Sequence, residues 1–249
     1  MNGCITYDND NAVSITTIGC QVDKIIELLS KNKCKNRQLG IIFDLFNRIK
    51  CNLVAIAMLD DDWATTPRNI LYRSVISDMM IAMYHLLATD EESAYCIEVD
   101  NCKHARSVYQ FLNLHCRLAL DYYNHSGTPI NQTEQELVNR YKKYFNDYIR
   151  DENGKWEFVK PAKSVQSSYK GTIQSIANYL EGKKDIIDFI PYLNMCYKEL
   201  SQTEHYSEKG RLFAFYTSED FYKFHKVILH GVMCSTNLYI ISSLMGEAS

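Results

Sequence analysis

Polar and titratable side chains occur inside one strongly apolar stretch of the sequence, residues 66–90. At helical spacing, Ser74, Asp78 and His85 fall within about 40° of one another on a single stripe. Arg73 lies beside that stripe. A charged group on an apolar helix is costly unless it is paired, so these side chains should meet one another, a neighbouring helix or a ligand.

A second group of such residues follows more than a hundred positions later. Tyr197, Ser201 and His205 are spaced i, i+4, i+8, which places them on one face of a helix. A histidine titrates near neutrality, and a neighbouring carboxylate or hydroxyl can orient it for acid–base work. If the protein is an enzyme, we expect His205 to act with Asp78 or a glutamate; a purely structural histidine is the alternative.

The two groups together carry a resemblance. The patterns R-S-x-x-D at Arg73–Asp78 and Y-x-x-L-S-x-x-x-H at Tyr197–His205 resemble a family of uncharacterised all-helical bacterial proteins. The similarity covers roughly residues 66–210 and implies a helical fold and a shared importance of these positions, without an activity. More loosely, the chain resembles helical nucleotide- and RNA-associated proteins of defence and toxin systems. Their ribonuclease mark is absent, because no arginine is followed by a histidine after four to six residues.

The composition excludes several classes of protein. Of 249 residues, 46% are apolar and 23% charged, which is typical of a globular protein and not of a disordered one. The net charge of −3 argues against a nucleic-acid partner, which usually selects a basic surface. Nine cysteines without a C-x-x-C pair predict reduced thiols in a cytoplasmic protein, most of them packed as small core residues.

Neither a membrane segment nor a metal site is expected. The first residues lack the basic and apolar regions of a signal peptide. Residues 227–245 contain several polar side chains and should form a core helix instead of a membrane span. No Glu-x-x-His pair occurs, so we expect no metal and no cofactor. A metal site built from His85, His205 and a carboxylate is the alternative.

Apolar periodicity predicts an all-α protein of about eight helices. The expected helices cover residues 18–30, 39–59, 66–90, 91–123, 133–150, 168–181, 185–205 and 218–244, and Asp100-Asn101 would allow a break in the fourth of them. No strand pair joined by a two-residue glycine turn is expected. Residues 1–16 should form an irregular arm and residues 17–249 a single helical domain, and a division into two lobes would fall at residues 151–167.

These observations leave three functions open. The favoured one is a binding or regulatory module, not an enzyme, that takes a small molecule or a protein partner at the polar cluster. Its lining residues are expected to be Arg73, Ser74, His85, Tyr197 and Ser201. The second is a hydrolase or nuclease that uses His205 with Asp78 or a glutamate. The third is a structural oligomer, such as a homodimer, with a buried polar network. In each case Arg73 and Asp78 should share a network with Ser201 or His205.

Overall fold

A computed structural model describes residues 13–34, 36–59, 65–126, 136, 143, 149–152, 155–158, 169–185, 187–202 and 218–247. These residues form seven helices and one two-stranded sheet, so the protein is all-α apart from that sheet. The contacts divide the chain into two compact units, Met1–Thr89 with Thr172–Ser249, and Asp90–Gly171. The expected single bundle of about eight helices is therefore not confirmed.

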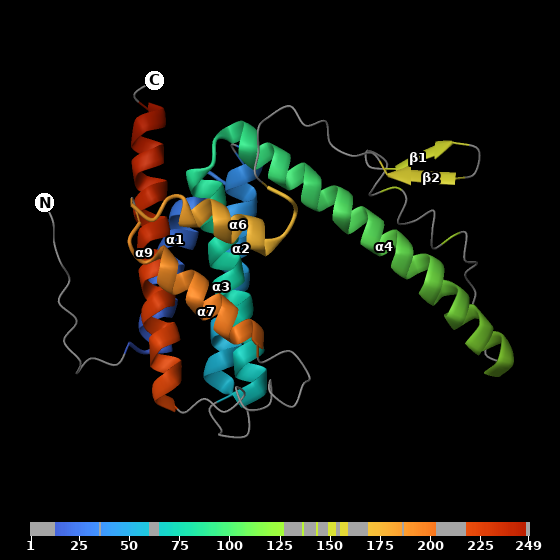
Figure 1. The fold of residues 1–249 in the computed structure, drawn as a ribbon, viewed down its shortest axis with the longest axis horizontal. Helices are drawn as coiled ribbons and strands as arrows, with labels where there is room; N and C mark the ends of the chain where they lie inside the picture. Colours follow the sequence, from blue (N-terminus) through green and yellow to red (C-terminus); the bar gives the residue numbers. More distant parts are fainter. Residues whose placement is uncertain are drawn as a thin grey trace, which may run out of the picture. The chain divides into compact units, whose positions relative to one another are not determined.

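Four long helices of the first unit lie alongside one another as a bundle (Figure 1). They are α1 (Ile15–Ser30), α2 (Arg37–Met58), α3 (Thr65–Leu87) and α9 (Ser218–Glu247). Each of the first two helices buries an apolar stripe at i, i+3, i+4 and i+7 spacing. In α1 the stripe is Ile18, Val22, Ile25 and Leu29.

The third helix is the centre of this unit. It contacts α2 and α9, and also the two shorter helices α6 (Ile173–Glu181) and α7 (Ile190–Gln202). A helix with neighbours on several sides is buried around most of its circumference, which explains why its sequence is apolar on several faces. Thr172 caps α6 through a capping box with Ser175. Because Pro191 occupies the first turn of α7, that helix begins later than the sequence pattern indicates.

Helices α3 and α9 approach closely at Gly231. A Cβ atom added at Gly231 would lie 1.8 Å from Sδ of Met79. We therefore expect Gly231→Ala to lower the free energy of unfolding by about 1–3 kcal/mol. Gly19→Ala is the matched control: nothing lies within 4 Å of its added Cβ, so helix propensity should make it stabilising by up to about 1 kcal/mol. Urea unfolding followed by circular dichroism measures both, and equal effects at the two glycines would contradict the close packing.

The last helix has one core face and one exposed apolar face. Its segment Phe221–Leu244 is long and apolar enough to cross a membrane by length and composition, a test that core helices of soluble proteins also pass. Phe224, Ile228 and Val232 are fully buried, as expected of a core helix, whereas Ile241 and Leu244 are exposed.

In the second unit, two predictions from the sequence are wrong. Its long helix α4 (Asp90–Ser126) covers the helix expected at residues 91–123 and continues through Asp100 without a break. Strands β1 (Ile149–Glu152) and β2 (Lys155–Phe158) pair antiparallel, so the expected helix to residue 150 and the expected absence of a hairpin are both wrong.

The sequence does contain the signal for this hairpin. Glu152 pairs with Lys155, and Asn153-Gly154 lies between them, the dipeptide most typical of a two-residue hairpin. In the backbone register Arg150 is paired with Glu157, two residues of opposite charge.

Seven of the cysteines in the described part of the chain form no disulfide: Cys20, Cys34, Cys51, Cys96, Cys102, Cys196 and Cys234. Cys96, Cys102 and Cys196 are buried as expected. Cys20, Cys34 and Cys51 are exposed, so for these three the core prediction is wrong.

Thiol labelling should separate the exposed from the buried cysteines. Burial raises the pKa of Cys196 to about 11 and that of Cys96 to about 12, which leaves very little reactive thiolate near neutral pH. After a pulse of iodoacetamide, peptide mass spectrometry should show Cys51 labelled at least about a hundredfold faster than Cys196. Similar rates would contradict the packing of α7.

Candidate functional site

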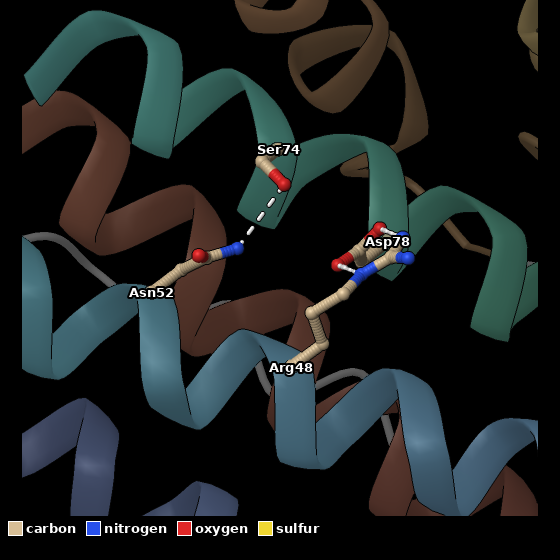
Figure 2. A network of polar contacts seen from close by, with 4 residues as sticks. All are labelled: Arg48, Asn52, Ser74 and Asp78. Atoms are coloured by element: carbon tan, nitrogen blue, oxygen red, sulfur yellow. Dashed lines mark hydrogen bonds and ion pairs between the residues drawn. The ribbon is translucent and has the colours of Figure 1, made fainter. Parts of the chain in front are cut away.

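The polar stripe of α3 faces α2 (Figure 2). Arg48 donates two hydrogen bonds to the fully buried carboxylate of Asp78, one of them from Nε to Oδ2 at 2.7 Å. One turn away, Asn52 Nδ2 donates to Ser74 Oγ at 3.1 Å. Burial raises the pKa of Asp78 and the bonds from Arg48 oppose that rise. Since Arg48 occupies both oxygens, Asp78 is poorly placed to act as a general base, and its geometry is that of a bond between helices.

Arg73 lies with the second group of residues instead. Its Nε donates to Ser201 Oγ at 3.2 Å, and its guanidinium carbon lies 5.6 Å from the ring centre of Tyr197. Ser201 Oγ in turn donates to the carbonyl oxygen of Tyr197 at 2.7 Å. The expected contact between the two groups is therefore present for Arg73 and Ser201. Asp78 turns to α2 instead, as a separation of about 140° on the helix allows.

Of the two histidines of the expected site, the structure describes only His85. His85 is 2% exposed, and burial lowers its pKa to about 4, so its ring is neutral at neutral pH. Its backbone oxygen accepts a hydrogen bond from Gln38 of α2. His205 lies outside the described residues, and its proposed action with Asp78 stays a prediction.

A buried tyrosine–histidine pair was missed by the sequence patterns. Tyr72 Oη lies 2.5 Å from His225 Nε2, and His225 Nδ1 lies 2.8 Å from the carbonyl oxygen of Val13. A carbonyl only accepts, so Nδ1 carries the proton and Nε2 accepts from Tyr72. Burial lowers the pKa of His225 and raises that of Tyr72. This pair fastens the segment before α1 to α3 and α9.

A groove with a volume of 750 Å³ runs between α6 and α7. Both helices line it with residues at helical spacing. These are Gln174, Ala177, Asn178 and Glu181 on α6, and Pro191, Asn194, Met195, Lys198, Glu199 and Gln202 on α7. Four of these side chains are amides, which can both donate and accept hydrogen bonds.

Asn194 lies in the groove wall, and hydrogen bonds fix the orientation of its side-chain amide. It is 8% exposed, and its Nδ2 donates to Glu181 Oε2 at 3.1 Å and, at 3.4 Å, to the carbonyl oxygen of Ala177. Both partners are acceptors, so the amide cannot be turned over. Oδ1 is buried and finds no donor among the residues that the structure describes. A buried unsatisfied acceptor costs about 1–3 kcal/mol.

Charges around the groove are close to balanced. Glu199 forms an ion pair with Lys223 of α9 at 2.6 Å. Oε1 of Glu181 lies 3.8 Å from Nζ of Lys184. Lys198 also lines the groove. This arrangement favours a neutral polar ligand over a strongly charged one.

Comparison of the chain with protein-family models, curated proteins and solved structures found no match. The resemblance of Arg73–Asp78 and Tyr197–His205 to a helical bacterial family therefore stays a prediction. Among the described residues, no group of three or more histidine, cysteine and acidic side chains could hold a metal ion. A function is therefore inferred from the contacts of α3, α6 and α7.

Proposed function

We propose that this protein is a ligand-binding module whose site is the groove between α6 and α7. The observation that carries the proposal is the groove itself, which has a volume of 750 Å³ and is lined by four amide side chains from two helices. Ligand pockets are concave and hold a few polar groups that orient the ligand, and the amides of this groove can both donate and accept hydrogen bonds.

The residues singled out in the sequence have a supporting role in this proposal. The contact of Arg73 with Ser201 fixes the end of α7 to α3, next to the groove residue Gln202. On the other wall, Tyr179 Oη donates to the carbonyl oxygen of Leu87 at 3.1 Å and fixes α6 to the end of α3. A site held by such contacts on rigid helices keeps its geometry when the ligand is absent.

A fragment screen tests this proposal. A library of small molecules that each carry an amide group should give hits in ligand-observed NMR with the wild-type protein. Asn178→Trp should abolish these hits, because Asn178 is exposed and a large ring there would fill the groove without disturbing the core. Asn237→Trp, at an exposed position of α9, is the matched control and should keep them. Hits that survive Asn178→Trp, or no hits at all, would refute the groove as the site.

A further inference from the structure

We draw no further inference here: the strongest candidate, the exposed apolar face of α9 that contains Met233, Ile240, Ile241 and Leu244, carries nothing, because nothing in the part of the chain that the structure describes shows what covers it.

Discussion

Replacing Arg48 with methionine should lower the free energy of unfolding of the helical bundle by about 3 kcal/mol, because it leaves the buried carboxylate of Asp78 without its partner. Asp78 is fully buried, whereas the side chain of Arg48 is 60% exposed. Removal of Asp78 should therefore cost much less: after Asp78→Leu, the guanidinium of Arg48 can turn to water, and we expect a loss under about 1 kcal/mol. Urea unfolding of the two variants measures this asymmetry.

The double variant and the pH dependence test whether the unpaired charge of Asp78 causes the loss of stability. Arg48→Met combined with Asp78→Leu should recover most of the stability, because no buried charge remains. Without Arg48 the pKa of Asp78 should rise further above its ordinary value. A carboxyl with a raised folded-state pKa gives stability below its unfolded pKa and loses it as the pH rises through the folded pKa, so Arg48→Met should be more harmful near pH 7 than near pH 4. Equal losses for the two single variants would contradict this description of the pair.

Acidification from about pH 7 to about pH 4.5 should destabilise the protein by about 2 kcal/mol through His85 alone. Burial lowers the folded-state pKa of His85 to about 4, whereas the unfolded chain has the ordinary value of 6.5. Between these values the unfolded state binds a proton that the folded state does not, so stability is full above pH 6.5 and is lost as the pH falls. The same direction holds for His225 and His230.

The slope of stability against pH is the measurement for His85. In His85→Leu and His85→Gln the difference in unfolding free energy between the two pH values should shrink by about 2 kcal/mol, whatever the change in absolute stability. Asn237→Leu, at an exposed position of α9, removes no titratable group; it is the control and should keep the wild-type slope. An unchanged slope in both His85 variants would mean that His85 is accessible to water.

The helices of the bundle could be predicted from the sequence, because burial of one apolar stripe repeats at 3.6 residues in α1 and α2. The hairpin was missed for a physical reason. Its two short strands contain five charged residues, which hide the apolar alternation that marks a strand, so the Asn153-Gly154 dipeptide was the one remaining signal.

The candidate site was harder to predict, because its contacts join residues from different helices. The contact of Arg73 with Ser201 followed from polar residues on apolar helices, which must be paired. The partner of Asp78 could not be predicted in this way. Arg48 lies in the middle of α2 among other polar residues, and nothing in its local spacing marks it. The groove depends on how α6 and α7 pack side by side, and amides at helical spacing on one helix usually indicate only a solvated face.

The most direct measurement follows the side-chain carbonyl of Asn194. Protein labelled with ¹³C at the asparagine Cγ atoms is titrated with pools of the amide-bearing fragments, and Asn194→Leu assigns the signal. We predict that at least one pool shifts the Cγ resonance of Asn194 in a saturable manner, because a ligand in the groove changes the surroundings of this side chain, and that the resonance of Asn237 does not move. An Asn194 resonance that no pool moves would contradict the proposal that this groove binds a ligand.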